Sequence, residues 1–201
     1  MNEQNNNSTL SFYDVNAKAF AEATQTVDFS KIQDHFLEFL PEHALILDYG
    51  CGAGRDSKRF QEKGYLVEAM DGSLEMCKTT EAFANVKVKH MLFQELKEVS
   101  RYDGIWACSS ILHLPYKELI MVFGLMATAL KSGGYVYTSF KYGDFEGERN
   151  GRYFTDMTEE KLTKLLQEVN QFQVTDLQVS TDVRPGRDDE RWLNIILQKK
   201  I

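Results

Sequence analysis

The stretch ALILDYGCGAGR, which runs from Ala44 to Arg55, decides the fold of this chain. It opens with an apolar run typical of a buried strand, reaches a carboxylate at Asp48, and continues with glycines at positions 50, 52 and 54 before a helical pattern begins. This order predicts a strand, a tight turn and a helix. Glycine permits a positive φ and a close approach of the backbone to a ligand, and the first N–H groups of the helix stay free for an anion. The stretch therefore predicts a binding site for a small molecule.

The glycine spacing and two carboxylates indicate which small molecule. The dinucleotide fingerprint is G-x-G-x-x-G, whereas this chain has G-x-G-x-G with Arg55 in place of the third glycine, and Asp48 would repel a pyrophosphate. A second apolar run, residues 65–70, ends at Asp71. A carboxylate at the end of this second strand can accept both hydroxyls of a ribose. One carboxylate for an amino group, one for a ribose and a helix N-terminus for a carboxylate together fit S-adenosylmethionine.

Four segments resemble those of the class I S-adenosylmethionine-dependent methyltransferases, in particular the small stand-alone type 11 and tellurite-resistance-like groups. They are LDYGCGAGRD for the glycine motif, VEAMDGS for the ribose-binding strand end, YDGIWACSSILHL for the fourth strand with its loop, and LKSGGYVYTSF for the fifth strand. The resemblance implies an α/β fold: a three-layer sandwich around a seven-stranded, mostly parallel Rossmann-like sheet, of order 3-2-1-4-5-7-6, with an antiparallel last strand.

The resemblance also implies the cofactor site. Asp48 would receive the amino group and Asp71 the ribose, while Tyr13 could fold over the donor as a lid or merely pack its helix. Many members place an Asp after the third strand to meet adenine, but this chain has Leu92 and Phe93 there, so adenine would meet the Phe93 backbone and apolar side chains. The predicted cofactor-binding residues are Tyr13, Asp48, Gly50, Cys51, Gly52, Arg55, Asp71, Gly72, Met76, Leu92, Phe93, Cys108 and Ser109.

The rest of the pattern predicts one methyltransferase domain, residues 12–201, behind a short tail. Residues 1–11 are polar and Asn-rich, which favours disorder. Residues 12–43 predict a helical cap with helices over 14–24 and 30–40, and residues 44–201 predict the Rossmann-like core. Strands and helices alternate through this core, and two consecutive strands, 172–180 and 192–198, close the chain as a hairpin.

Two long loops, residues 141–157 and 181–190, are expected at the carboxyl edge of the sheet, where open α/β folds bind ligands. Arginines gather in and beside them, which predicts an acceptor pocket with affinity for negative charge: Arg149, Arg152, Arg184, Arg187 and Arg191. Acidic neighbours leave a second, equally weighted interpretation, in which these arginines only form solvated ion pairs. The predicted substrate-binding residues are Tyr142, Arg152, Tyr153 and Arg184, and the two tyrosines could supply a hydroxyl or only an aromatic wall.

His113 is the candidate catalytic residue. It follows the predicted fourth strand, and the ordinary pKa of histidine suits proton transfer near neutral pH. The alternative is a loop histidine that packs or caps the helix opened by Pro115. A base is needed only if the acceptor is not already anionic. The four histidines show no metal-ligand spacing, so no metal is expected.

Composition narrows the partners. The chain has 201 residues, a net charge of −7 and no apolar run long enough to cross a bilayer, so we expect a cytoplasmic protein that binds neither nucleic acid nor membrane. The three cysteines are expected to be reduced. The sequence therefore predicts methyl transfer from S-adenosylmethionine to a small, anionic acceptor. The alternatives are a non-catalytic S-adenosylmethionine-binding protein and, less favoured, a nicotinamide-dependent oxidoreductase.

Overall fold

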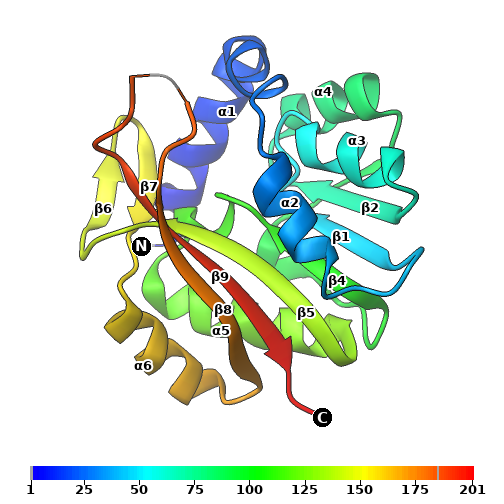
Figure 1. Cartoon of the computed structure of the whole chain (residues 1–201). Coiled ribbons are helices and arrows are strands. Elements are labelled where there is room, and N and C mark those ends of the chain that lie inside the picture. The colour runs from blue at the N-terminus through cyan, green and yellow to red at the C-terminus, as the bar shows by residue number, and fades with distance from the viewer. Residues whose placement is uncertain (1, 185) are drawn as a thin grey trace.

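The structure is a computed structural model, and it describes residues 2–184 and 186–201, with side chains from Ser8 onward (Figure 1). Its helices are α1 (Asn2–Thr24), α2 (Ser30–Leu37), α3 (Arg55–Glu62), α4 (Leu74–Ala84), α5 (Tyr116–Ala129) and α6 (Glu159–Val169), with the short 3₁₀ turns η1 (Phe93–Glu95) and η2 (Ile111–His113). Its strands are β1 (Leu45–Tyr49), β2 (Leu66–Asp71), β3 (Val88–His90), β4 (Tyr102–Ala107), β5 (Leu130–Lys141), β6 (Glu146–Arg149), β7 (Arg152–Thr155), β8 (Phe172–Thr181) and β9 (Arg191–Lys199).

The main sheet has seven strands in the order β3-β2-β1-β4-β5-β9-β8. Strands β1 to β5 pair in parallel, and β9 is antiparallel to both of its neighbours. Because β9 is the last strand and β8 the one before it, the predicted order 3-2-1-4-5-7-6 is confirmed. Parallel strands with crossover helices bring the carboxyl ends of β1, β2, β4 and β5 to one edge.

Alternate residues of the strands face two helical layers. Ile46 of β1 packs with Phe36 of α2 and Phe60 of α3 on one face of the sheet, where α4 also packs. Leu47, its neighbour in the strand, belongs to the large core on the opposite face, which α5 and α6 cover. A fully buried aromatic pair stabilises the first face: Trp106 stacks on a tyrosine of β5 with ring centroids 4.0 Å apart. The predicted three-layer sandwich is therefore confirmed.

The N-terminal segment differs from the prediction. A disordered tail was expected over residues 1–11, but α1 is one continuous helix from Asn2 to Thr24; Met1 lies outside the described residues. Tertiary contacts explain the helix, because the hydroxyl of Thr9 accepts a hydrogen bond from the backbone N–H of Tyr153, and a Cβ on Gly72 would lie 2.8 Å from the side chain of Leu10. Composition alone does not reveal such contacts.

The segment 141–157 is a hairpin instead of an irregular loop. Strands β6 and β7 pair in an antiparallel ladder that ends at Arg149 and Arg152. The two residues between them, Asn150 and Gly151, have φ values of 52° and 75°. An Asn-Gly pair with both φ angles positive is the usual two-residue hairpin turn, so this dipeptide was an available signal. Four-residue strands are too short to show a clear alternation.

Among the described helices, none is long and apolar enough to span a membrane.

Candidate active site

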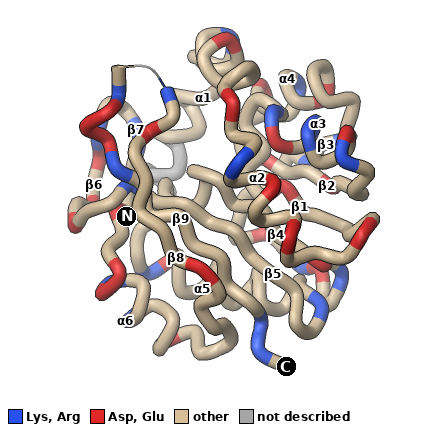
Figure 2. The backbone as a smooth tube through the Cα atoms, in the orientation of Figure 1, with Lys and Arg blue, Asp and Glu red and all other residues tan. Residues whose placement is uncertain are grey.

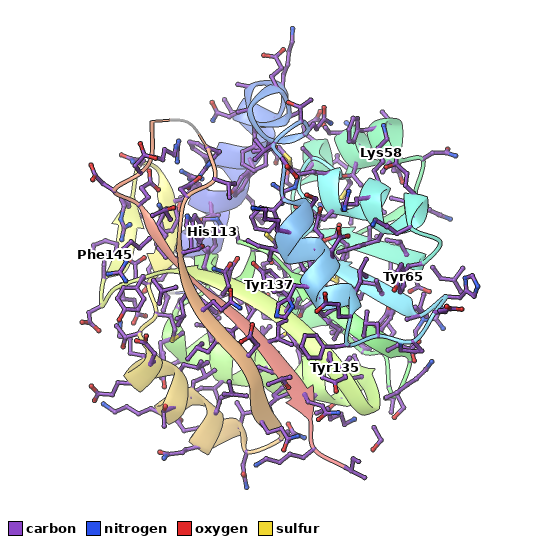
Figure 3. The ribbon with its side chains drawn as sticks, viewed as in Figure 1. Lys58, Tyr65, His113, Tyr135, Tyr137 and Phe145 are labelled. Carbon is purple, nitrogen blue, oxygen red and sulfur yellow. The ribbon has the colours of Figure 1, made fainter. Side chains whose placement is uncertain are left out.

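A cavity of about 460 Å³ lies at the carboxyl edge of the sheet, and α1 closes one side of it. Its volume is within the range of small-molecule sites. Fifteen of the residues predicted from the sequence line it: Tyr13, Gly50, Cys51, Gly52, Arg55, Asp71, Gly72, Met76, Leu92, Phe93, Cys108, Ser109, His113, Arg152 and Arg184. Figure 3 shows His113 in the interior, beside the β6–β7 hairpin.

The glycine turn forms the floor of the cavity between β1 and α3. Gly50 has a φ of 88°, and a Cβ there would lie 2.5 Å from the Cβ of Ser110. Its backbone N–H and that of Cys51 donate to the carbonyl of Met70, which ties the turn to β2. Gly54, with a φ of 85°, is the N-cap residue that precedes α3. The turn therefore requires glycine for both its backbone angles and its close packing.

Asp71 is held in place at the end of β2. Its Oδ2 accepts the backbone N–H of Gly52 at 2.9 Å, and its Oδ1 accepts that of Ser73, also at 2.9 Å. Burial raises the pKa of this carboxyl, and the two N–H groups oppose that rise. Each oxygen keeps a second lone-pair direction for a ligand hydroxyl. The carboxylate is thus positioned before any ligand arrives.

The structure places Asp48 beneath the glycine turn instead of in the cavity. The residue is 2% exposed, and its carboxylate accepts a hydrogen bond from the Ser57 hydroxyl at 2.5 Å. Burial, followed by the nearby charge of Asp56, raises the pKa of this carboxyl well above its ordinary value. In this geometry the Asp48 carboxylate does not reach the cavity, so it is not placed to contact the donor's amino group directly. The sequence pattern located the glycine turn, but it did not reveal that the Asp48 side chain lies outside the cavity lining.

Asp56 was missed by the sequence reasoning, although it lines the cavity. Its carboxylate accepts hydrogen bonds from Arg55 at 2.8 and 2.9 Å, from Gln33 at 2.5 Å and from the indole N–H of Trp106 at 2.9 Å. These partners come from three separate elements, so no local pattern reveals them. The Arg55 guanidinium also lies 4.4 Å from the ring centroid of Phe29. Asp56 therefore orients Arg55 at the start of α3.

Helix α1 covers the cavity and is joined to α4. Asp14 accepts the Ser73 hydroxyl at 2.6 Å and the Glu75 backbone N–H at 3.3 Å. Tyr13 is the predicted residue on this helix, but other α1 side chains also line the cavity: Thr9, Leu10, Phe12, Asn16, Phe20 and Thr24. The helical spacing of Tyr13 and Phe20 could have indicated a shared face. The helix therefore forms a lid over the cavity.

His113 sits in a fixed hydrogen-bonded position. Its Nδ1 lies 2.7 Å from the backbone carbonyl of Tyr153, and its Nε2 lies 2.8 Å from the hydroxyl of Tyr13. Burial lowers its pKa to about 4, and the charge of Arg152 also lowers it. At neutral pH the ring is therefore uncharged.

The two arginines predicted to bind the substrate, Arg152 and Arg184, have different surroundings. Arg184 forms two hydrogen bonds with Asp182, at 2.9 and 2.5 Å, which favours the ion-pair interpretation for this residue. Arg152 donates a hydrogen bond to the Tyr13 hydroxyl at 3.4 Å, and its guanidinium lies 4.4 Å from the Phe12 ring centroid, while its buried Nε has no hydrogen-bond partner within the part of the chain that the structure describes. Figure 2 shows basic and acidic residues together in the loop between β8 and β9, which carries Arg184.

Tyr142 and Tyr153 do not line the cavity, contrary to the prediction. The Tyr142 hydroxyl donates to Glu159 at 2.9 Å, and the Tyr153 hydroxyl donates to Glu146 at 3.0 Å. Tyr153 alternates with Arg152 and Phe154 along β7, so its side chain points to the opposite face from theirs. Only its backbone contributes to the site, through the carbonyl that meets His113.

Comparisons with known proteins agree with this geometry. Residues 46–134 match the family described as "Methyltransferase domain". The Bacillus subtilis (strain 168) protein named "Putative methyltransferase YqeM" is 34% identical over 120 residues, which cover 52% of this chain and 47% of that protein. This chain thus spans about half the length of that curated relative.

Solved structures extend the likeness over nearly the whole fold. The Burkholderia thailandensis 1,6-didemethyltoxoflavin-N1-methyltransferase, solved with 1,6-didemethyltoxoflavin and S-adenosylhomocysteine, has a TM-score of 0.75 at 21% identity, covering 96% of this chain and 85% of that chain. A Methanosarcina mazei S-adenosylmethionine-dependent methyltransferase has a TM-score of 0.73 at 20% identity, covering 87% and 99%. Together with the strand order, these likenesses show that the chain has the fold of S-adenosylmethionine-dependent methyltransferases, and residues 46–134 of it match a methyltransferase domain.

Proposed function

We propose that this protein transfers a methyl group from S-adenosylmethionine to a small, anionic acceptor. One cavity carries the proposal. It contains the carboxylate of Asp71, already oriented at the glycine turn, and the guanidinium of Arg152 on the hairpin, which has no carboxylate partner among the described residues. The first group suits a donor ribose, and the second suits an acceptor's negative charge.

The donor would lie along the glycine turn. Asp71 would accept the ribose hydroxyls, and the N-terminus of α3 with Arg55 would meet the donor's carboxylate. The adenine would lie against Leu92 and Phe93, where the hydroxyl of Tyr49 donates to the Phe93 carbonyl at 2.5 Å and fixes the backbone. This arrangement leaves the sulfonium directed toward the rest of the cavity.

In methyl transfer the main task of the protein is to position the donor and the acceptor. The sulfonium already activates the methyl group, so the enzyme must align the acceptor with the methyl–sulfur bond and exclude water. Good alignment can supply on the order of 7 to 11 kcal/mol. The lid helix α1, which is joined to α4 through Asp14, would keep water out.

The charges around the cavity support an anionic acceptor. Five basic residues line it, and four of them contact a carboxylate: Arg55 with Asp56, Arg184 with Asp182, and Lys141 and Arg187 with Glu190. Arg152, the fifth, has no carboxylate partner among the residues that the structure describes. Arg152 is half-buried, and its Nε is fully buried; a cation partly removed from water without a counter-charge is costly, and a bound anion would lower that cost. The Burkholderia relative binds a small heterocycle, 1,6-didemethyltoxoflavin, which fits the small-molecule part of the proposal.

Ligand-induced stabilisation tests the proposal. S-adenosylmethionine and S-adenosylhomocysteine should each raise the unfolding temperature, because a ligand at about 100 times its dissociation constant adds roughly 2.7 kcal/mol. NADH should not. The release of S-adenosylhomocysteine is then measured over a panel of small acids and their neutral amides. No stabilisation by millimolar donor or product, with calorimetry also silent, would refute the donor assignment; a stabilised protein that turns over only neutral acceptors would refute the anionic acceptor.

A further inference from the structure

Three side chains from three separate elements meet in the cavity: Tyr13 of α1, Arg152 of β7, and His113 of the turn η2 after β4. We infer that the methyl transfer uses no protein base: the acceptor enters already ionised, Arg152 holds its charge, and Tyr13, in an orientation set by His113, accepts a hydrogen bond from Arg152 and positions it. This inference rests on the proposed methyl transfer and changes the role of His113 from a catalytic base to a positioning residue.

The hydrogen-bond partners determine the state of the imidazole. The carbonyl of Tyr153, 2.7 Å from Nδ1, can only accept a hydrogen bond, so Nδ1 carries a hydrogen. In the neutral ring Nε2 then has a lone pair, and the Tyr13 hydroxyl, 2.8 Å away, must donate to it. The phenolic hydrogen is thus already used. Tyr13 presents only the lone pairs of its oxygen to Arg152 and to the cavity.

This arrangement is unsuited to general-base catalysis. A proton from the acceptor would have to pass through Tyr13 and leave His113 as an imidazolium. The groups around His113 are the Tyr13 hydroxyl, the Tyr153 carbonyl, the Phe154 ring and the Arg152 guanidinium. None of them is a carboxylate, and Arg152 would repel the new positive charge. Burial lowers the pKa of His113 to about 4, which agrees with this geometry.

Arg152 offers what an ionised acceptor requires. Its guanidinium lies 4.4 Å from the ring centroid of Phe12 and 5.1 Å from that of Phe154, and its buried Nε lacks a hydrogen-bond partner among the described residues. The guanidinium suits a negatively charged group, and the rings around it suit a small, flat apolar body. An aromatic carboxylate or the anion of an acidic enol or phenol combines the two.

The step then balances without a proton transfer. A lone pair of the anionic acceptor atom forms the new bond to the methyl carbon. The methyl–sulfur bond breaks, and its electron pair stays on sulfur, which becomes the neutral thioether of S-adenosylhomocysteine. The negative charge of the acceptor and the positive charge of the sulfonium disappear together, so no proton has to leave the cavity.

The first arm of the test reads the protonation state of His113. The full chain is labelled with ¹⁵N-histidine, and its imidazole nitrogens are followed by NMR from pH 8 to pH 4.5, with and without S-adenosylhomocysteine. The variant His113→Gln assigns the signal. We expect a neutral ring with the hydrogen on Nδ1 at pH 7, and a higher pKa in Arg152→Gln because a nearby positive charge is removed. A His113 that is charged, or that titrates near pH 7, would overturn the inference.

The second arm tests the anion site with benzoate and its neutral analogue benzamide, titrated calorimetrically into the protein. We expect benzoate to bind at least tenfold more tightly, and Arg152→Gln to abolish that preference. His113→Gln should keep the preference for benzoate. The glutamine amide can donate to the Tyr153 carbonyl and accept from the Tyr13 hydroxyl, as the neutral imidazole does, but it takes up no proton. Arg191→Gln, an exposed arginine outside the cavity, is the matched control.

Equal binding of the two probes to the wild type, or no binding of either, would overturn the inference, as would a preference that survives Arg152→Gln. Both arms are readable on the free protein. A failure of S-adenosylhomocysteine to bind would therefore contradict the proposed function separately from this inference.

Discussion

The Nε2 atom of His113 lies 2.8 Å from the hydroxyl of Tyr13, a residue 100 positions earlier in the chain. This hydrogen bond joins the lid helix α1 to the segment after β4. The Tyr13 hydroxyl also accepts a hydrogen bond from Arg152, which belongs to the hairpin β6–β7. Closure of the lid and orientation of the Tyr13 hydroxyl are therefore coupled, because neither can change without breaking the same bond.

Asp71→Ala should weaken S-adenosylhomocysteine binding by at least tenfold. Its carboxylate would accept the ribose hydroxyls, and hydrogen bonds to a charged group contribute on the order of 1.5 to 3 kcal/mol each. The measurement is a calorimetric dissociation constant in a variant whose fold is verified by circular dichroism. Asp144→Ala removes a carboxylate whose side chain is 82% exposed, and it should leave affinity unchanged. An unchanged dissociation constant in folded Asp71→Ala would place the ribose elsewhere.

Arg184→Gln should lower the free energy of unfolding by about 2 kcal/mol, because it removes the charged partner of a carboxylate. The Asp182 side chain is 3% exposed; burial opposes its ionised form, but hydrogen bonds from Arg184 and Trp192 lower its pKa to about 2. Adding Asp182→Asn to Arg184→Gln should restore most of the loss. Urea denaturation of the two variants measures this. Little loss in Arg184→Gln would instead return Arg184 to the role of acceptor recognition.

The ends of β1 and β2 were predictable because a run of apolar, buried residues is followed there by an acidic residue and glycines. The apolar runs before Asp48 and Asp71, and the glycines between them, place two carboxylates at the right edge of the sheet. Which carboxylate faces the ligand depends on the pleat and the turn. Asp48 points to the side where Ser57 of α3 packs, whereas Asp71 lines the cavity. A one-dimensional pattern does not separate these outcomes.

The acceptor side was less predictable for a related reason. Neighbours along β7 point to opposite faces, so Arg152 enters the cavity while Tyr153 points away from it. The hairpin had to be recognised before this alternation could be used. The roles of Asp14 and Asp56 depend on contacts between residues 23 to 61 positions apart, which only the folded chain displays.

Stability should depend on pH through His113. Its folded pKa of about 4 lies below the unfolded value near 6.5, so the neutral ring contributes stability above pH 6.5 that is lost as the pH falls toward 4. His113→Gln should remove this contribution. Between pH 7 and pH 4.5, the wild type should lose more free energy of unfolding than the variant, by on the order of 3 kcal/mol at most. Parallel pH curves in urea denaturation would contradict the buried, neutral histidine.

Asp14→Ala should loosen the lid without unfolding the core. The Asp14 carboxylate accepts two hydrogen bonds at the start of α4, from the Ser73 hydroxyl and the Glu75 N–H, and it attaches α1 to the cavity rim. Its loss should cost about 1 to 2 kcal/mol of lid closure and weaken S-adenosylhomocysteine binding several-fold. Hydrogen–deuterium exchange measures the lid directly: the product should protect α1 strongly in the wild type and weakly in the variant. Glu22→Ala, an exposed change on the same helix, should behave as the wild type. If α1 exchanges equally in Asp14→Ala and Glu22→Ala, the contact with α4 does not control closure, and the other contacts of α1, such as the hydrogen bonds of Tyr13 to His113 and of Thr9 to Tyr153, would have to hold the lid.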